Sequence, residues 1–216
     1  MYLSPGIAFG FHGCDQTVFD RVIKQGEHLS ASENDYDWLG HGIYFWEGSC
    51  ERALEWAQQS KSIHTPAVVG AVIKLGNCVD LLDSFYLNQA QIAYQILSRE
   101  FEELGKPLPE NRLRDKNGIT FLRDLDCQVI MRLHQMNNQA IMEDLSLSDM
   151  QGQNKRKVQN HPSFLDSVRG MFPEGDPLYS NAGFQSRNHI QLCIVNPNAI
   201  VGYFDPRHRN VWYKPV

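Results

Sequence analysis

The 216-residue sequence has no long apolar run, no closely spaced cysteines and only 21% charged side chains. Its most apolar stretch, residues 67–75, is far shorter than the roughly 20 residues that cross a membrane, so we expect no transmembrane anchor and no membrane partner. Residues 1–13 lack the basic and apolar segments of a secretory signal. We therefore expect a cytoplasmic protein.

Cysteine and histidine patterns exclude the common metal and disulfide classes. The five cysteines are odd in number and far apart, which indicates reduced, mostly buried thiols rather than a disulfide framework or a zinc ribbon. No two of the eight histidines have the H-x-x-x-H spacing of a helical zinc site. The sequence also contains no Walker loop, and we predict no metal.

The net charge of −5 is unevenly distributed. Residues 151–216 carry eight Lys/Arg and four Asp/Glu, whereas residues 1–150 carry 12 and 21. Such asymmetry indicates either a surface for an anionic partner or a solvated basic loop. The densest basic cluster is Lys155-Arg156-Lys157.

The first part of the chain is expected to alternate between strands and helices. Residues 7–11 form a short apolar run, after which Asp15 caps a helix that ends at Gly26. Residues 43–46 have the aromatic and β-branched composition of a strand. Ser49 is then placed to cap a second helix with an apolar face.

Further strands are expected in the middle and at the end of the chain. Residues 68–75 predict a core strand, which residues 78–82 extend or pair with after a turn. Residues 146–163 are polar and predict an exposed loop. Residues 190–195 and 200–204 are strand-like again.

Apolar residues recur with helical spacing over residues 85–104 and 119–143, which predicts a helical insertion at 84–144. No linker divides the chain, so residues 1–216 are expected to form a single domain. Because regular β-α-β alternation is missing, the predicted fold class is α+β.

Three short segments resemble the motifs of one known family. They are Phe11-His12-Gly13, Gly40-His41-Gly42-Ile43-Tyr44-Phe45 and, more weakly, Asn188-His189-Ile190-Gln191-Leu192. The first two are similar in order and spacing to the poly(ADP-ribose) polymerase-like branch of the ADP-ribosyltransferases. The resemblance covers residues 7–82 and resumes at about 187–204.

This resemblance implies two small antiparallel β-sheets that face each other across an NAD-binding cleft, with flanking helices and the central helical insertion. His12 would hydrogen-bond the adenosine ribose, and the Gly13 backbone would approach the nicotinamide amide. Gly42 belongs to the same binding motif, and Tyr44 would stack on the nicotinamide. Arg169 is the candidate for the pyrophosphate, although an ordinary surface arginine fits equally well.

The third catalytic position departs from the family pattern. Aligning the Asn196-Pro197 turn places Gln191 where the family has a glutamate, and a shift of two residues places His189 there instead. Glutamine cannot present a negative charge to an oxocarbenium ion, so weaker activation is expected. Glu174, or less readily Glu47, would then supply the carboxylate.

The resemblance implies an enzyme that cleaves NAD as a substrate and transfers a single ADP-ribose to a macromolecule, in the manner of toxin or defence enzymes. The basic C-terminal region, with Trp212 and Tyr213 beside Arg207, Arg209 and Lys214, favours RNA or DNA over protein as acceptor. An inhibitory protein partner would fit the helical insertion. A catalytically silent NAD or ADP-ribose binding module and an NAD glycohydrolase remain open alternatives.

Overall fold

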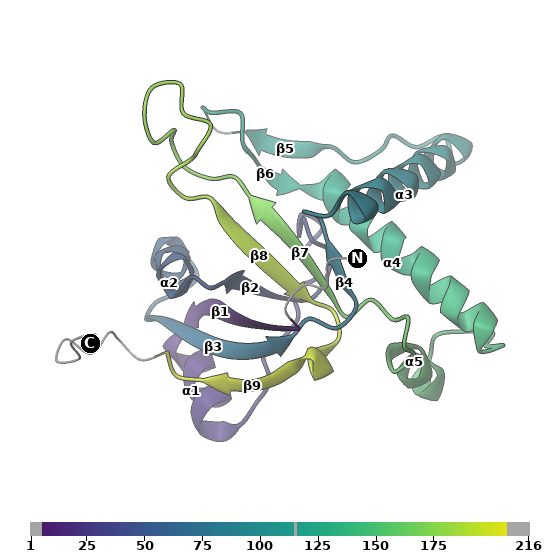
Figure 1. Cartoon of the computed structure of the whole chain (residues 1–216), viewed down its shortest axis with the longest axis horizontal. Helices are drawn as coiled ribbons and strands as arrows, with labels where there is room; N and C mark the ends of the chain where they lie inside the picture. Colours follow the sequence, from purple (N-terminus) through teal and green to yellow (C-terminus); the bar gives the residue numbers. More distant parts are fainter. Residues whose placement is uncertain (1–5, 115, 207–216) are drawn as a thin grey trace.

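The computed structural model describes residues 6–114 and 116–206 and has the mixed α+β composition that the sequence predicts (Figure 1). Helices flank a large sheet, and a smaller two-stranded sheet lies apart from it. In chain order the elements are β1 (Ile7–Asp15), α1 (Gln16–Gln25), β2 (Ile43–Glu47), α2 (Cys50–Gln59), β3 (Pro66–Lys74), β4 (Cys78–Asp80), α3 (Ser84–Glu103), β5 (Asn111–Arg114), β6 (Thr120–Arg123), α4 (Asp124–Asp144), α5 (Gly152–Gln159), β7 (Ser167–Phe172), β8 (His189–Ile194), a 3-10 turn (Pro197–Ala199) and β9 (Ile200–Phe204).

Seven strands form one sheet in the order β4-β7-β8-β2-β1-β3-β9. We expected two small antiparallel sheets, but the pairing of β2 with β8 makes the hydrogen-bonded ladder continuous, and β4 runs parallel to β7. In Figure 1, β1, β3 and β9 lie nearly horizontal while β7 and β8 cross them steeply. The sheet is therefore strongly twisted, and β2 lies at the junction of its two halves.

The first two helices begin and end where their capping residues predict. Asp15 accepts a hydrogen bond from Thr17 N at the start of α1, and Gly26 ends that helix in the left-handed conformation, with φ of 75°. Ser49 accepts from Arg52 N at the start of α2. These caps satisfy backbone groups that the helix itself leaves unpaired.

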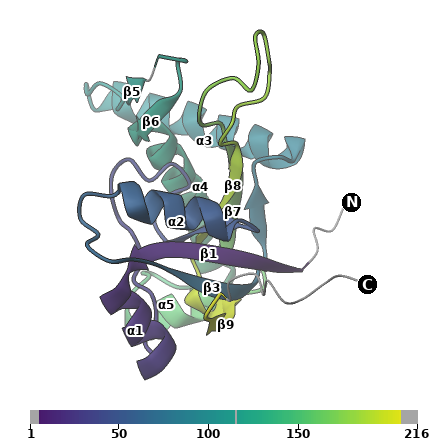
Figure 2. The same cartoon turned by 90° about the vertical axis from the view of Figure 1, so that its left-hand side faces the viewer.

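Each face of the sheet has its own hydrophobic core. On one face, α1 packs against β1, β2 and β3 around Phe45, Val69 and Ile73. On the other face, α3 and α4 pack over β7 and β8, with Ala93 and Ile130 among the buried residues. Figure 2 shows α1 and α3 at opposite ends of this view of the molecule.

Several local expectations need correction. Residues 78–80 form β4, which pairs with β7 and not with β3, at the other end of the sheet. The side-chain amide of Asn77 donates a hydrogen bond to the Phe164 carbonyl oxygen and so holds the start of β4 beside β7. Residues 152–159 form helix α5 instead of an exposed loop, because Val158 is buried against Ile141 of α4. Residues 120–123 form a strand rather than the first turn of a helix.

Two further features concern cysteine and membranes. All five cysteines are free thiols; Cys14, Cys127 and Cys193 are buried, as predicted, and the other two are partly buried. Among the helices of the described residues, none is long and apolar enough to cross a membrane.

Candidate functional site

The three motif segments meet on neighbouring strands. His12 lies on β1, Tyr44 on β2 and Gln191 on β8, and the sheet order places β2 between the other two. Tyr44 is opposite Cys193, and Trp46 is opposite Gln191. Since side chains two residues apart on a strand share a face, Tyr44 and Gln191 are diagonal neighbours on one face.

The Tyr44 phenol anchors the loop before β2. Its hydroxyl donates a hydrogen bond to the Gly40 carbonyl at 2.8 Å and accepts one from the Leu39 amide at 2.9 Å. Burial raises the pKa of this phenol far above its ordinary value, so Tyr44 stays neutral. Its ring is thereby held in one orientation beside β8.

His12 lies where β1 and β2 separate. The two strands pair at Gly10 and Phe11, and one residue later the His12 Nδ1–H donates to the Tyr44 carbonyl oxygen at 2.8 Å. Its ring packs edge-on against Phe45, with ring centroids 5.9 Å apart. Burial lowers the His12 pKa. His12 therefore touches the backbone of Tyr44, but its ring lies on the opposite face from the phenol.

Gln191 is held between two aromatic partners. Its Oε1 accepts from Trp38 Nε1 at 2.7 Å. Its Nε2 lies 3.1 Å from Nε2 of His189, whose Nδ1 lies 2.8 Å from the Arg187 carbonyl oxygen. Because a carbonyl can only accept, Nδ1 carries the proton and Nε2 accepts from the glutamine amide. Burial lowers the pKa of His189, whose ring stacks on Phe172.

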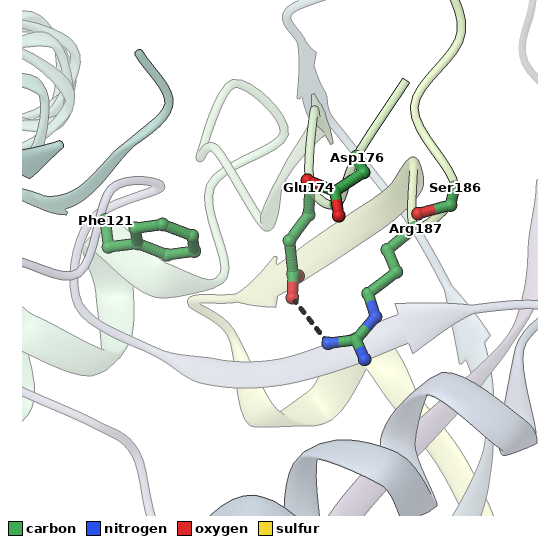
Figure 3. A pocket seen from close by; sticks show the side chains of 6 residues that line it. Phe121, Glu174, Asp176, Ser186 and Arg187 are labelled. Carbon is green, nitrogen blue, oxygen red and sulfur yellow. Dashed lines mark ion pairs between the residues drawn. The ribbon is translucent and has the colours of Figure 1, made fainter. Parts of the chain in front are cut away.

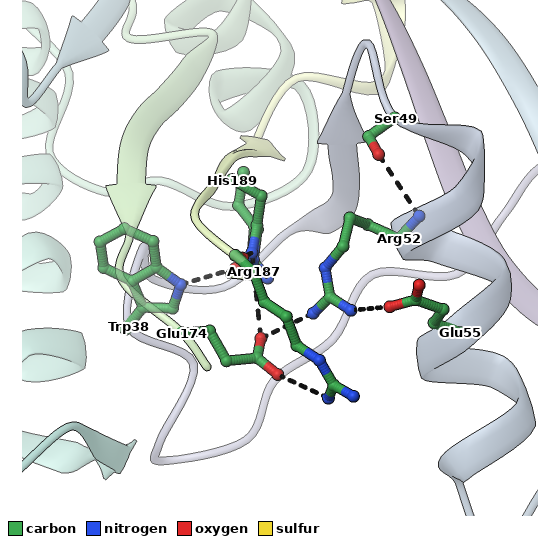
Figure 4. Close-up of polar contacts among 8 residues, drawn as sticks. Trp38, Ser49, Arg52, Glu55, Glu174, Arg187 and His189 are labelled. Carbon is green, nitrogen blue, oxygen red and sulfur yellow. Dashed lines mark hydrogen bonds and ion pairs between the residues drawn. The ribbon is translucent and has the colours of Figure 1, made fainter. Parts of the chain in front are cut away.

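Glu174 lies at the end of this network (Figure 4). Its carboxylate is 2.8 Å from Arg52 Nη2, 3.7 Å from Arg187 Nη1 and 3.9 Å from His189 Nδ1. Arg52 comes from α2 and also pairs with Glu55 on the next turn. The Nε of Arg52 is buried without a hydrogen-bond partner. Glu174 and His189, two of the residues predicted from the sequence, therefore lie close together beside Gln191.

A cavity of about 350 Å³ opens next to Glu174 (Figure 3). One side is formed by the segment that joins β7 to β8, and the other by β6. The lining residues are Phe121, Glu174, Gly175, Asp176, Ser186 and Arg187.

The two motif glycines allow close packing. A Cβ at Gly13 would lie 2.2 Å from the Ala53 carbonyl oxygen of α2. A Cβ at Gly42 would lie 2.6 Å from both Cys193 Sγ and the Ile194 carbonyl oxygen. The packing of α2 and β8 is therefore sufficient to require glycine at both positions, without a ligand.

Arg169 and Glu47 do not reach this cluster. Arg169 Nε lies 2.6 Å from Glu47, and Nη1 lies 3.0 Å from Asp80. By strand alternation these side chains lie on the opposite face of β2 and β7 from Trp46 and Gly170. The sheet thus separates Arg169 from Gln191, and both carboxylates already occupy its guanidinium group.

The predicted basic surface is only partly described. Lys155, Arg156 and Lys157 are exposed on α5, which packs against α4 and away from the Glu174 cluster. Trp212, Tyr213, Arg207, Arg209 and Lys214 lie outside the described residues.

Sequence reasoning missed three members of the site, which are Trp38, Arg52 and Arg187. Trp38 lies among the polar, turn-forming residues 27–40, yet it is buried and lies across Gly170, where a Cβ would be 2.6 Å from its ring. Arg52 lies in the first turn of α2, the helix that follows the second motif, and this position was the available signal. Arg187 had no local signal, because the fold of residues 173–188 brings it back to Glu174.

Comparisons with known proteins leave the family open. No protein-family model matches the chain, and no solved structure matches it. The chain is 24% identical over 210 residues to "Uncharacterized protein MJ0359" of Methanocaldococcus jannaschii, an alignment that covers 88% of this chain and 83% of that protein. Within the described residues, no group of three or more His, Cys, Asp or Glu side chains is arranged to hold a metal ion.

Proposed function

We propose that the chain is an NAD-dependent mono-ADP-ribosyltransferase with an altered catalytic centre. One observation carries the proposal: three motif segments from distant parts of the sequence converge on adjacent strands, with His12 bonded to the Tyr44 carbonyl and Tyr44 diagonal to Gln191. The resemblance implies that these segments line one cleft, and their convergence supports the proposal.

In the proposed reaction, the bond between C1′ of the ribose and nicotinamide breaks, and nicotinamide leaves with the bonding electrons. An acceptor atom then bonds to C1′ and loses its proton. Gln191, fixed by Trp38 and His189, orients the ribose hydroxyls by hydrogen bonding. Glu174 supplies the negative charge that stabilises the cation and accepts the proton.

The test is nicotinamide release and ADP-ribose transfer by the purified chain. Labelled NAD is incubated with fractionated protein, RNA and DNA, and the label is followed into each fraction. Replacing Glu174 by Gln should lower the rate of nicotinamide release about a hundredfold, whereas Glu103→Gln, an exposed change at the end of α3, should leave it unchanged. If NAD remained uncleaved in the presence of every fraction, the proposal would be overturned.

A silent binding module is the second candidate, and one observation favours it. Both oxygens of Glu174 already face arginines, and each end of the Gln191 amide already has a partner, an arrangement that is stable without a substrate. NAD or ADP-ribose would then bind without cleavage. Calorimetry with NAD, followed by analysis of the recovered nucleotide, separates the two functions, and nicotinamide release without an acceptor would identify an NAD glycohydrolase.

A further inference from the structure

We infer that the cavity between β6 and residues 173–188 receives a guanine base of a single-stranded nucleic acid, which would be the acceptor of the proposed transferase. This inference rests on the proposed function for its biological meaning. The binding itself rests on the chemistry of the cavity lining and can be measured without NAD.

The segment that forms one wall is a rigid extension of the β7–β8 hairpin. Arg187 N donates to the Glu174 carbonyl at 2.9 Å, and Ser186 N donates to the Asp176 carbonyl at 2.9 Å. A further bridge joins Pro177 to Gln185. The cavity wall is therefore ordered before any ligand binds, which reduces the entropic cost of binding.

The opposite wall anchors this extension and supplies an aromatic face. Asn117 Nδ2 donates to the Gly175 carbonyl at 3.2 Å, and Lys116 pairs with Asp176 at 3.0 Å. Phe121 on β6 is 38% exposed and packs against Phe172 behind it, with centroids 6.0 Å apart. An aromatic ring supported from behind and open in front is suited to stack on a planar base.

Both carboxylates of the cavity lining already have cationic partners, which favours a neutral ligand. The charged lining residues are Glu174, Asp176 and Arg187. Both carboxylates are already paired with cations, Glu174 with Arg52 and Arg187 and Asp176 with Lys116. An arginine or lysine of a protein acceptor would compete with cations already in place. A neutral ring that carries both donors and acceptors meets no such competition.

Guanine offers the matching set of groups. Its N1–H and N2–H₂ are adjacent donors for a carboxylate such as Glu174, and its O6 and N7 are acceptors for the guanidinium of Arg187 and the hydroxyl of Ser186. Adenine and cytosine each lack the adjacent pair of donors that guanine presents. The exposed aromatic rings of Tyr179 and Phe184, farther along the hairpin extension, would meet neighbouring bases.

The experiment measures binding of a labelled oligothymidine with one central guanine by fluorescence anisotropy. Replacing that guanine by inosine, which lacks N2–H₂, or by adenine should weaken binding about tenfold. Phe121→Ala should weaken binding of the guanine oligonucleotide about tenfold, and Phe121→Leu, which keeps apolar volume against Phe172, should do the same while the protein stays folded. Phe85→Ala, at an exposed aromatic on α3, is the matched control and should change nothing.

Equal affinity for the three oligonucleotides, or an unchanged affinity in Phe121→Leu, would overturn the inference. Binding of an arginine-containing peptide in preference to the guanine oligonucleotide would also overturn it and would point to a protein acceptor. Nicotinamide release is measured in parallel. Guanine-selective binding without any NAD cleavage would disprove the proposed function but support the base-binding site. NAD cleavage without base selectivity would support the proposed function but disprove the base-binding site.

Discussion

The indole N–H of Trp38 donates to the Gln191 side-chain oxygen at 2.7 Å, which sets the orientation of that amide. The amide nitrogen of Gln191 must then face His189, whose Nε2 is 3.1 Å away. Trp38 is itself held against Phe172 and beneath the Arg123 guanidinium, whose carbon is 4.4 Å from the indole centroid. Gln191 is therefore a fixed dipole, and its donor and acceptor ends are both assigned.

Replacing Gln191 by Glu tests this assignment and the proposed reaction together. A carboxylate still accepts from Trp38, but it cannot donate to Nε2 of His189, so two acceptors would face each other. Protonation of His189 relieves this contact and should raise the pKa of His189 above its wild-type value, as NMR titration of the imidazole would measure. The added negative charge should also raise nicotinamide release about tenfold.

The matched control for this change is Gln153→Glu, which adds the same charge on the exposed surface of α5. It should alter neither the imidazole titration nor the rate. If Gln191→Glu left the His189 titration unchanged, the hydrogen bond between these two side chains would be disproved. An unchanged rate with a shifted titration would instead remove Gln191 from the reaction.

Gly13→Ala should destabilise the fold by about 3 kcal/mol, because the new Cβ would lie 2.2 Å from the Ala53 carbonyl and would push α2 away from β1. Denaturant unfolding measures the loss. Gly202→Ala on β9, where a Cβ meets nothing within 4 Å, should change stability little. A stable Gly13→Ala variant would show that α2 can shift freely, and would make the nicotinamide contact the better explanation of this glycine.

Local signals predicted much of the fold. The caps Asp15 and Ser49 and the stop at Gly26 depend on backbone groups within a few residues, so sequence alone places both early helices. The partner of β4 could not be predicted in this way. It depends on contacts such as that between Asn77 and Phe164, which lie 87 residues apart, and no local pattern records such a separation.

In the candidate site too, local motifs predicted some residues, whereas others depend on contacts between distant parts of the chain. Tyr44 and Gln191 were identified because their strands carry motifs, and Glu174 because it could supply the carboxylate that Gln191 lacks. Residues 167–172 form β7, and the alternation of a strand places Arg169 and Gly170 on opposite faces of the sheet. Because neighbouring residues of β7 face opposite sides of the sheet, Arg169 lies beside Glu47 on one side and Trp38 packs on Gly170 on the other.

Arg169→Met should destabilise the protein by about 2 kcal/mol without changing the KM for NAD. The substitution leaves Glu47 and Asp80 facing each other without a cation at partly buried positions, and breaking fully buried pairs costs about 3–5 kcal/mol. Lys24→Met, which breaks the exposed pair with Asp20, should cost less than about 1 kcal/mol. If stability were unchanged and the KM for NAD were raised, Arg169 would instead be a residue that binds the NAD pyrophosphate.

Acid should destabilise the fold through His134, which is 6% exposed on α4 and has no partner for its Nε2. Burial lowers the pKa of His134 to about 4 in the folded state, against about 6.5 in the unfolded chain. The unfolded state therefore binds more protons below pH 6.5, and the free energy of unfolding should fall by roughly 3 kcal/mol as the pH drops toward 4, then level off. His134→Phe should flatten this part of the pH profile in urea unfolding, although the lowered pKa values of His12 and His189 retain a share of it. The control His64→Phe, at an exposed position, should leave the pH profile of stability unchanged. If the wild type and both variants gave the same profile, His134 would bind its proton in the folded state as readily as in the unfolded state.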